Sequence, residues 1–214
     1  MSLTHSYAPE ADLNAAQAGV EKPFRLQPIK ALRALSRLLK DKEDTVQVFE
    51  IMRALSGRSI PNGYARLLNT PAGGAIAFRH QELADILSDR DYLARLPEGS
   101  VGRVYLQFTT SENISAQGLI EDSRKGIDDG IDSAHPFAWY GRRLRDIHDL
   151  WHILTGYGRD GLGEACLVGF SYAQTKSLGF GLIAIAGALK SSKEIPGQPA
   201  ARAASLRCPV PPSL

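Results

Sequence analysis

The residues best suited to chemistry in this chain are two histidines one helical turn apart and the carboxylates near them. His148 and His152 stand four residues apart in the segment HDLWH, where Asp149 lies between them, and eleven residues separate His152 from Glu164. Residues four apart share one face of an α-helix, so both imidazoles can bind one ion. The spacing therefore predicts a divalent metal site, and an ordinary polar helix face is the alternative.

A helix over residues 139–155 would place the two histidines in one arc with Asp149 and Arg145, because successive residues advance by about 100° around a helix. Asp149 could bind the ion directly or orient another ligand. Arg145 could steer an anionic carboxylate toward the site. It could equally form a salt bridge with Asp149, four residues further along the helix.

A glycine-rich turn follows this helix and should bring a second helix back to the histidines. Gly156 is a good helix stop, and Asp160 is a suitable N-cap for the helix after it. Three further glycines permit a tight reversal: Gly158, Gly161 and Gly163. In an antiparallel hairpin Glu164 returns level with His152, which gives a ligand set suited to Zn²⁺, Mn²⁺ or Fe²⁺. A zinc peptidase is a weaker alternative, because Asp149 is one methylene shorter than the glutamate of HExxH.

Apolar residues recur at helical spacing along most of the chain, which predicts an all-α, single-domain helical bundle with a metal-bearing helical hairpin. The first helix should begin at Pro28, and others should cover 45–55, 81–87, 91–96, 101–108, part of 111–135 and most of 139–190. Between the second and third of these helices, we expect Pro61, Pro71 and Gly73-Gly74 to cut the chain into short pieces. A flexible arm over 1–27 and an irregular Pro/Ala/Arg-rich tail over 194–214 then flank a helical domain over 28–193.

Composition excludes several classes of protein. The chain has 214 residues, of which 43% are hydrophobic and 22% charged, as in ordinary globular domains. A net charge of +2 argues against a broad basic patch, so we expect no nucleic-acid partner. Cys166 and Cys208 form no CxxC pair, and we expect no disulfide framework, a reducing cytoplasm and a Cys166 side chain that is simply packed in the interior.

The first expected helix is amphipathic and basic. Apolar residues share one face: Ile29, Leu32, Leu35 and Leu39. Basic residues form a neighbouring strip: Lys30, Arg33, Arg37 and Lys40. Such a helix could lie on an anionic membrane surface. The pattern alone favours a helix that packs against the core and leaves its basic face in solvent.

The last strong helix carries two stripes that could hold a lipid chain or a neighbouring helix. Small residues form one stripe: Ser177, Gly181, Ala184 and Ala188. Apolar residues form the other: Leu178, Leu182, Ile185 and Leu189. Small residues let another backbone or a lipid lie close, and helix packing is the interpretation we favour. Tyr157 and Arg159, in the turn beside the site, are expected to contact substrate.

These residues resemble those of the coenzyme Q (ubiquinone) biosynthesis protein Four family. HDLWH followed by eleven residues and Glu164 matches its HDxxHx11E signature. The segments RLRDIHDLWHILTGYGRDGLGEACLVGFSYAQT and GFGLIAIAGALK look like its central block, and LPEGSVGRVYLQF is similar to its upstream segment. The resemblance covers residues 30–195 in outline and is strongest over 140–190.

The resemblance implies an all-helical fold and a divalent metal held by four residues: His148, Asp149, His152 and Glu164. Zn²⁺ is the first choice, with Mn, Fe or Co as alternatives. It also implies a prenylated quinone precursor as ligand, a homodimer, and association with other ubiquinone biosynthesis proteins at a membrane surface. The activity implied is that of a carbon–carbon lyase, which removes the ring carboxylate at carbon 1 of a polyprenyl-hydroxybenzoate, with or without hydroxylation of that carbon.

Catalytic roles in that reaction would fall to Asp149 or Glu164 as proton-transfer groups and to Arg145 as the group that steers the carboxylate. The apolar helix that contains Gly181 would contact the prenyl chain. The rival function is a non-catalytic scaffold that presents the prenylated precursor to partner enzymes. An oxygen-rich ligand set without cysteine favours catalysis over a structural metal.

The ends of the chain bear on its location. The start, MSLTHSYAPEADL, has no apolar segment of the signal-peptide type, and the longest apolar stretch, Leu178–Leu189, is shorter than the roughly 20 residues that span a bilayer. We therefore expect a cytoplasmic protein peripheral to the inner membrane face. Family members usually end in a further helical segment, and we interpret the different tail here as frameshifted or truncated, which puts contacts made by that segment in doubt.

Overall fold

The computed structural model describes residues 25–41, 44–112 and 135–194, with side chains as far as Lys190. Most of the expected N-terminal arm, nearly all of the expected helix and loop over 111–135, and the expected irregular tail lie outside these residues. The helices of the described part are α2 (Pro28–Leu38), α3 (Thr45–Ala54), α4 (Ser59–Leu68), α5 (Pro71–Arg79), α6 (Leu83–Ser88), α7 (Arg90–Arg95), α8 (Val101–Ser111), α10 (Pro136–Thr155), α11 (Gly161–Thr175) and α12 (Leu178–Glu194). This part of the chain contains no strand, so the all-α prediction is confirmed.

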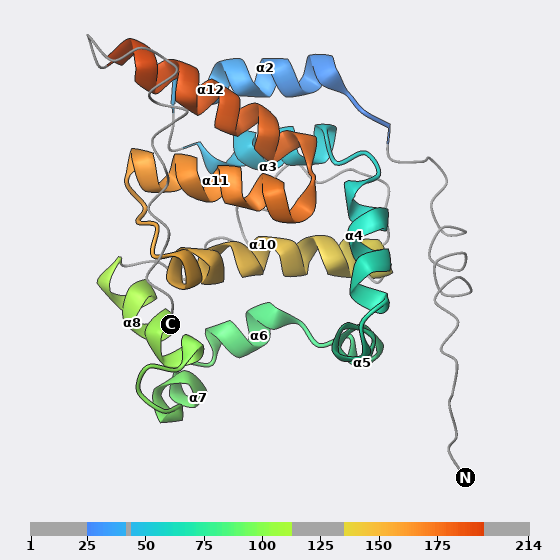
Figure 1. The fold of residues 1–214 in the computed structure, drawn as a ribbon, viewed down its shortest axis with the longest axis vertical. Helices are drawn as coiled ribbons and strands as arrows, with labels where there is room; N and C mark the ends of the chain where they lie inside the picture. Colours follow the sequence, from blue (N-terminus) through green and yellow to red (C-terminus); the bar gives the residue numbers. More distant parts are fainter. Residues whose placement is uncertain (1–24, 42–43, 113–134, 195–214) are drawn as a thin grey trace.

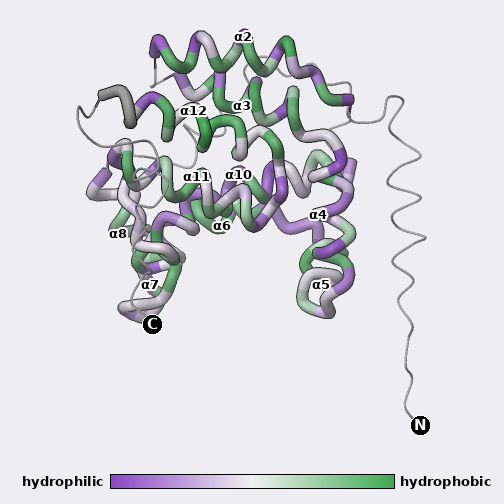
Figure 2. The backbone as a smooth tube through the Cα atoms, turned by 45° about the horizontal axis from the view of Figure 1, so that its top comes forward, coloured by the Kyte–Doolittle hydropathy of each residue, from purple (hydrophilic) through white to green (hydrophobic). Residues whose placement is uncertain are grey.

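The helices are stacked around α10, which crosses the middle of the molecule (Figure 1). Helix α11 lies back along α10, α12 covers α11, and α2 and α12 form the upper edge over α3. Helices α4 and α5 close one end, while α6, α7 and α8 lie below the other half of α10. The same upper edge is seen from another angle in Figure 2, where hydrophobic and hydrophilic residues alternate along α2.

Two apolar clusters hold α10 in place. The first joins the beginning of α10 to α4 and α5, and its buried members are Tyr64, Leu68, Ala77, Phe137 and Trp139. The second lies between α6, α7 and α8, with buried members Leu83, Leu87, Leu93 and Tyr105. Ile147, Leu150 and Ile153 of α10 pack against the second cluster. Helix α10 is thus fixed along its length, and this positions the site near its end.

The prediction that Pro61, Pro71 and Gly73-Gly74 cut this stretch into short pieces is confirmed at Pro71, where one short helix has ended and the next begins, and is wrong at Pro61 and at Gly73-Gly74. Pro61 lies in the first turn of α4 and Pro71 begins α5. The first N–H groups of a helix have no partner inside it, so proline costs little there. Gly73 lies inside α5, where the Thr70 hydroxyl accepts a hydrogen bond from its N–H, and a Cβ at this glycine would stand 2.0 Å from the Leu67 oxygen.

Helix α2 does not bury the face that its sequence pattern favours. Its buried residues are Ala31 and Ala34, whereas Ile29, Leu32 and Leu39 are 66%, 58% and 41% exposed. The helix packs on α3, its main partner. Small alanine side chains allow the close contact, so the larger apolar residues are left on the outer side.

Two further expectations concern cysteine and membranes. Cys166 is buried, as expected, but it is disulfide-bonded in the structure, so the prediction of a merely packed thiol is wrong. Within the described residues, no helix has both the length and the apolar character needed to cross a bilayer.

Candidate metal centre

The turn between α10 and α11 forms as its residue types predict. Gly156 ends α10 with a left-handed φ of 70°, which glycine adopts without the penalty that a Cβ brings. The Asp160 side chain caps α11 by accepting hydrogen bonds from two backbone N–H groups at 3.0 and 3.1 Å. A Cβ at Gly163 would stand 2.1 Å from the Gly158 oxygen, so the two backbone segments of the turn can approach this closely only because both positions are glycine. This tight reversal brings the start of α11 beside the end of α10.

Three side chains converge across this turn. The Nε2 atom of His152 lies 3.4 Å from one Glu164 oxygen, and the Nε2 atom of His148 lies 3.9 Å from the other. One donor atom from each residue falls within 4.8 Å of the other two. Ligands about 2.1 Å from a tetrahedral ion stand about 3.4 Å apart, so the separations are close to those that a bound ion requires.

The backbone fixes which nitrogen of His152 faces the centre. Its Nδ1 atom lies 2.8 Å from the Tyr157 carbonyl oxygen, which can only accept a hydrogen bond, so Nδ1 is the donor. In the neutral ring the lone pair is then on Nε2, the atom that faces Glu164. A hydrogen bond from the second ring nitrogen to a carbonyl is the usual support of a metal-binding histidine.

The electrostatics of the three residues favour an ion pair when no metal is bound. Burial acts to raise the pKa of Glu164, but hydrogen bonds and charge from His148 and His152 outweigh it and bring the pKa to about 2. Burial acts to lower the pKa of His152, but the hydrogen bonds to Glu164 and the Tyr157 carbonyl raise it above the ordinary value. The carboxylate is therefore ionised and ready to bind a cation.

Asp149 lies beside this group rather than within it. It is not one of the three residues whose donor atoms cluster, so the four-ligand set expected from the resemblance is brought together only in part. Burial raises the pKa of Asp149, and the charge of Glu164 raises it further against the opposing effects of His148, His152 and Arg159. Asp149 is thus the carboxyl group at this site that most readily keeps a proton.

Two aromatic rings that sequence reasoning missed form the walls of the site. Phe108 of α8 stacks on His152 with ring centroids 5.7 Å apart, and Phe180 of α12 stacks on His148 at 6.4 Å. Tyr105 of α8 is almost fully buried, and its pKa is raised by burial and then by the charges of Asp149 and Asp146. None of these residues carries a local signal, because tertiary packing alone brings α8 and α12 to the hairpin.

The other predicted site residues have different surroundings. Arg145 is paired with the adjacent Asp146, at 2.6 Å, and its side chain is 9% exposed. Arg159 is exposed and lies 3.8 Å from Glu112. The Tyr157 backbone supports His152, as described above. At Gly181 a Cβ would stand 3.3 Å from the ring of Tyr172, which places this glycine in the contact between α11 and α12.

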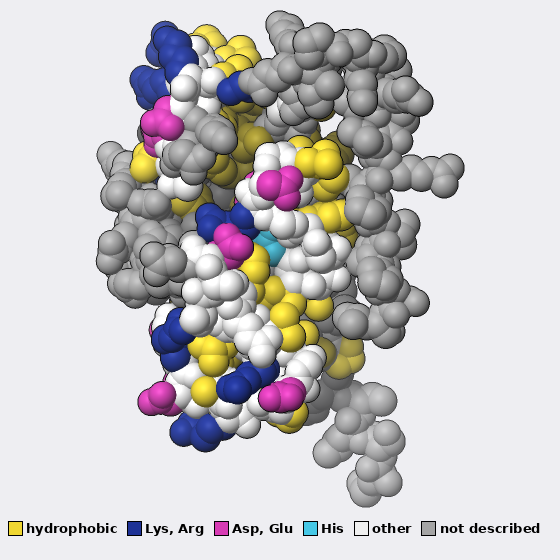
Figure 3. All heavy atoms as spheres, turned by 90° about the vertical axis from the view of Figure 1, so that its left-hand side faces the viewer, with side chains coloured by type: hydrophobic (Ala, Val, Ile, Leu, Met, Phe, Trp, Pro, Cys, Tyr) yellow, Lys and Arg dark blue, Asp and Glu magenta, His cyan; other side chains and the backbone are white. Residues whose placement is uncertain are grey.

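The site lies near the surface at the end of the molecule where α10 passes into α11. His148 has a side-chain exposure of 25% and Glu164 of 37%. Figure 3 views the molecule from this end and shows a histidine side chain at the surface between basic and acidic ones. A small ion or the head of a substrate could therefore reach the three donors from solvent.

Comparison with known proteins gives one family and several relatives. The family model described as "Coenzyme Q (ubiquinone) biosynthesis protein Coq4" matches residues 29–196. The "Ubiquinone biosynthesis protein COQ4 homolog, mitochondrial" of Danio rerio is 30% identical over 110 residues, which cover 51% of this chain and 38% of that protein. The homologue of Rattus norvegicus is 32% identical over 108 residues, which cover 49% of this chain and 37% of that protein.

A fungal relative gives the same result. The "Ubiquinone biosynthesis protein coq4, mitochondrial" of Talaromyces stipitatus is 32% identical over 109 residues, which cover 51% of this chain and 36% of that protein. The matched part therefore spans well under half the length of each of these relatives. No solved structure shows a significant match to the chain.

Proposed function

The chain belongs to the Coq4 family of coenzyme Q (ubiquinone) biosynthesis proteins, which gives it a role in that biosynthesis, and on this basis we propose a metal-dependent reaction at its hairpin. The reaction is the removal of the ring carboxylate at carbon 1 of a polyprenyl-hydroxybenzoate precursor. The chain is in this proposal a carbon–carbon lyase. It works with other ubiquinone biosynthesis proteins, as a homodimer, at the inner face of a membrane in which its prenylated precursor resides.

The observation that carries the proposal is the convergence of His148, His152 and Glu164. Two imidazole nitrogens and a carboxylate oxygen lie within 4.8 Å of one another, and the Tyr157 carbonyl selects the His152 tautomer that a metal needs. Three nitrogen and oxygen ligands with a position left open are typical of catalytic Zn²⁺, and the same donors suit Mn²⁺, Fe²⁺ or Co²⁺. Structural zinc is instead usually closed by cysteines.

A bound metal would act as a Lewis acid that polarises an oxygen of the substrate. The residues of the chain supply the rest. When the bond between the carboxylate and carbon 1 breaks, carbon dioxide leaves and the electron pair stays on the ring carbon. Asp149 is the proposed proton donor to that carbon, since its pKa is raised and it lies next to the three ligands. If carbon 1 were instead hydroxylated, the hydroxyl would take the place of the proton, and dioxygen would be the oxidant and would leave, together with the hydrogens of one water, as hydrogen peroxide.

Other residues bind and orient the precursor in this proposal. Arg145 steers the carboxylate, and its guanidinium has enough N–H donors to keep Asp146 as a partner at the same time. Tyr157 and Arg159 contact the ring substituents from the turn. Gly181 keeps α12 close to α11, and the apolar side chains beside it contact the prenyl chain. Glu164 is foremost a ligand and shares in proton transfer only where an oxygen is free.

A scaffold that presents the prenylated precursor to partner enzymes is the second candidate. The observation in its favour is the outer face of α12, where Leu178, Ile185 and Leu189 are between 49% and 61% exposed. A surface of this kind could hold a lipid without any chemistry at the hairpin. Metal binding without turnover would identify this function.

The decisive experiment compares the wild type with the double variant His148→Ala/His152→Ala. We would measure metal content by elemental analysis and carbon dioxide release from a prenylated 4-hydroxybenzoate. His80→Ala is the matched control, since His80 is the C-cap residue after α5 and lies outside the site. We expect about one metal ion per wild-type and control chain and neither metal nor turnover in the double variant. A folded wild type without metal would contradict the proposal.

The role of Asp149 requires a separate variant. Asp149→Asn keeps the shape of the side chain but cannot deliver the proton, so we expect turnover to fall about 100-fold or more while the metal stays bound. Loss of the metal in this variant would instead make Asp149 a ligand. Unchanged turnover would remove it from the mechanism.

A further inference from the structure

The outer face of α2 carries a row of apolar side chains that the rest of the described structure does not cover. Ile29, Leu32 and Leu39 are 66%, 58% and 41% exposed, although each is large enough to serve as a core residue. The opposite face of the helix packs on α3 through Ala31 and Ala34. An exposed row of this length costs solubility, so it indicates a surface that something else covers.

Helix α12 carries a second row on the same edge of the molecule. Leu178, Ile185 and Leu189 are 49%, 61% and 54% exposed. The inner side of α12 packs on α11 and α3, so its exposed row points away from the layer on which α2 also rests. The ends of the two helices are joined where the Lys190 ammonium donates a hydrogen bond to the Leu39 carbonyl at 3.2 Å. We call the two rows together the α2–α12 edge.

Basic residues run beside the apolar row on α2. They are Lys30, Arg33, Arg37 and Lys40. Glu50 of α3 lies 3.8 Å from Lys30 and 4.0 Å from Arg37, distances at the outer limit of an ion pair. At the top of Figure 3, where the α2–α12 edge lies, hydrophobic side chains gather beside Lys and Arg side chains. Apolar residues flanked by cations match the boundary between acyl chains and anionic headgroups.

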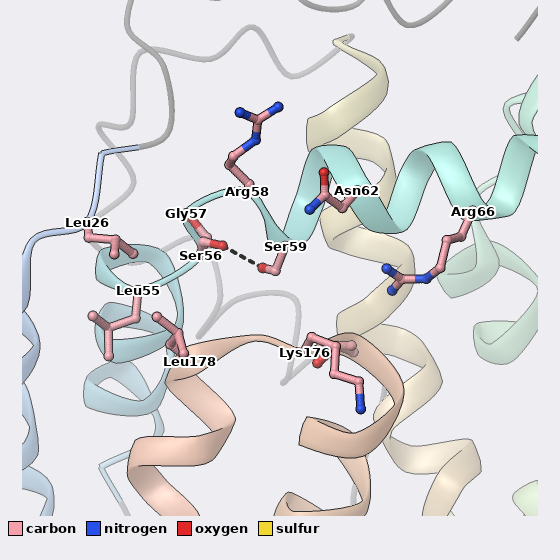
Figure 4. Close-up of a pocket in the computed structure, with 11 residues that line it drawn as sticks. Leu26, Leu55, Ser56, Gly57, Arg58, Ser59, Asn62, Arg66, Lys176 and Leu178 are labelled. Atoms are coloured by element: carbon pink, nitrogen blue, oxygen red, sulfur yellow. Dashed lines mark hydrogen bonds between the residues drawn. The ribbon is translucent and has the colours of Figure 1, made fainter. Parts of the chain in front are cut away.

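A cavity at one end of the α2–α12 edge also combines an apolar side with a basic side. Its volume is about 460 Å³, and it is lined by Leu26 and Leu178, with Leu55 beside them, and by the basic residues Arg58, Arg66 and Lys176. In Figure 4 the three leucines gather on one side, and Arg66 and Lys176 lie on the other. Leu26 lies just before the apolar row of α2, and Leu178 begins that of α12. An anionic headgroup could thus bind where both rows start.

We infer that the α2–α12 edge docks on an anionic lipid bilayer, with the two apolar rows in the acyl boundary and the basic strip of α2 on the lipid phosphates. A second copy of the chain is disfavoured as the occupant, because a symmetric contact would bring the basic strips of the two copies together. The bilayer supplies both the apolar layer and the negative charge that this surface lacks.

This docking gives α12 a place between the bilayer and the metal centre. Its outer row would contact lipid, while Phe180 on its inner side stacks on His148. A precursor held in the bilayer would have its ring only the thickness of one helix from the three donors. This consequence rests on the proposed function, whereas the docking itself requires neither metal nor substrate.

The test is co-sedimentation of the purified full chain with vesicles. We would compare phosphatidylcholine vesicles with vesicles that also contain phosphatidylglycerol, at low and high salt. We expect binding to the anionic vesicles that weakens as salt screens the charges. Ile29→Gln/Leu32→Gln should weaken binding at least tenfold, because two large side chains no longer enter the acyl boundary. Arg33→Gln/Lys40→Gln should weaken it about thirtyfold, since each cation near an anionic surface contributes about a factor of five.

Matched controls separate docking from general surface effects. Phe78 on α5 is 87% exposed and lies far from the edge, so Phe78→Gln should bind as the wild type does. Arg79→Gln/Arg95→Gln removes two exposed charges elsewhere and should also have little effect. Helical content by circular dichroism would show that each variant is folded.

The inference fails if the edge variants and the controls bind anionic vesicles equally well, or if the wild type does not bind them at all. Self-association of the wild type that the Ile29→Gln/Leu32→Gln pair abolishes, without vesicle binding, would assign the edge to a second copy. The variant His148→Ala/His152→Ala must still bind vesicles. If this variant binds vesicles but shows no turnover, the docking proposal stands without the proposed reaction. If an edge variant shows turnover but no longer binds vesicles, the proposed reaction stands without the docking.

Discussion

The two halves of α10 show two different ways in which a helix is held. In the first half, Phe137 and Trp139 are 2% and 1% exposed, and both lie near Tyr64 in edge-on contacts of 5.7 and 6.5 Å between ring centroids. In the second half, the residues that face the neighbouring helices include His148 and His152, which contact Glu164. The first half is fixed by aromatic packing, whereas the second half combines apolar packing of Ile147, Leu150 and Ile153 on one side with charge and hydrogen bonds at the histidines.

The difference has an energetic consequence. Burying an aromatic side chain is favourable under all ordinary conditions, because it removes apolar surface from water. The ion pair at Glu164 is partly buried and adds little net stability, since desolvation of its charges offsets most of their attraction. The aromatic first half of α10 therefore anchors the fold, and in the second half the face that carries the histidines can serve a ligand.

Trp139→Ala should be the most destabilising change. It removes a fully buried ring from the first cluster, and we expect the free energy of unfolding to fall by about 3–5 kcal/mol. Chemical denaturation would measure this loss. Trp151, which is partly buried and lies edge-on to Phe170, is the matched control, and Trp151→Ala should cost clearly less. If the folded fraction of Trp139→Ala bound no metal, the two halves of the helix would not be independent.

Gly163→Ala should destabilise the turn between α10 and α11 for a purely steric reason. The new Cβ would stand 2.1 Å from the Gly158 oxygen, so the turn must open and Glu164 must move with it. We expect a loss of about 1–3 kcal/mol in stability together with weaker metal binding. At Gly161 a Cβ meets no atom within 4 Å, and Gly161→Ala should change stability by less than about 0.5 kcal/mol. Equal effects of the two variants would show that the turn is not tight.

As pH rises through the pKa of His152, the affinity for metal should increase, whereas the stability of the ion-free chain should decrease. Metal must displace the proton on Nε2 of His152, so affinity should fall about tenfold per pH unit below the raised pKa of His152. Calorimetric titration with Zn²⁺ would measure it. An affinity that stays constant down to pH 5 would mean that His152 is not a ligand.

Without a bound ion, the pair of His152 and Glu164 stabilises the chain in its own pH range. The raised pKa of His152 contributes stability that is complete below its ordinary value of 6.5 and is lost as pH rises through the folded value. The lowered pKa of Glu164 contributes stability above its ordinary value of 4.5, and this is lost as pH falls toward 2. The contribution of the pair should therefore be greatest between pH 4.5 and 6.5. Thermal unfolding with and without a chelator would show the opposite trends.

Asp160→Ala should have the smallest effect. It removes the side chain that accepts hydrogen bonds from two N–H groups at the start of α11, and we expect a loss of about 1 kcal/mol. Asp160→Ser keeps a capping oxygen and should lose much less. Urea denaturation of both variants would compare them, and identical curves would show that the cap contributes nothing.

Local rules predicted much of the hairpin. The start of α2 at Pro28, the stop at Gly156, the cap at Asp160 and the return of Glu164 to His152 follow from residue types and spacing. The break expected at Pro61 was wrong, because proline is harmless in the first turn of a helix and its position in that turn was not known in advance, whereas the chain does break just before Pro71. Arg145 was expected to face Asp149 or substrate, and the structure pairs it with Asp146.

Residue types and spacing were enough to predict the all-α class, the hairpin and the three donors that meet at it, because helical periodicity, caps and the i, i+4 spacing act over a few residues. Which aromatic rings enclose the donors, and which face of α2 is left outside, depends on the packing of whole helices. Phe108 and Phe180 reach the histidines from distant helices, and Ala31 rather than Leu32 meets α3, because these contacts depend on how close whole helices approach. That distance is set by every side chain in the interface, and no local pattern records it.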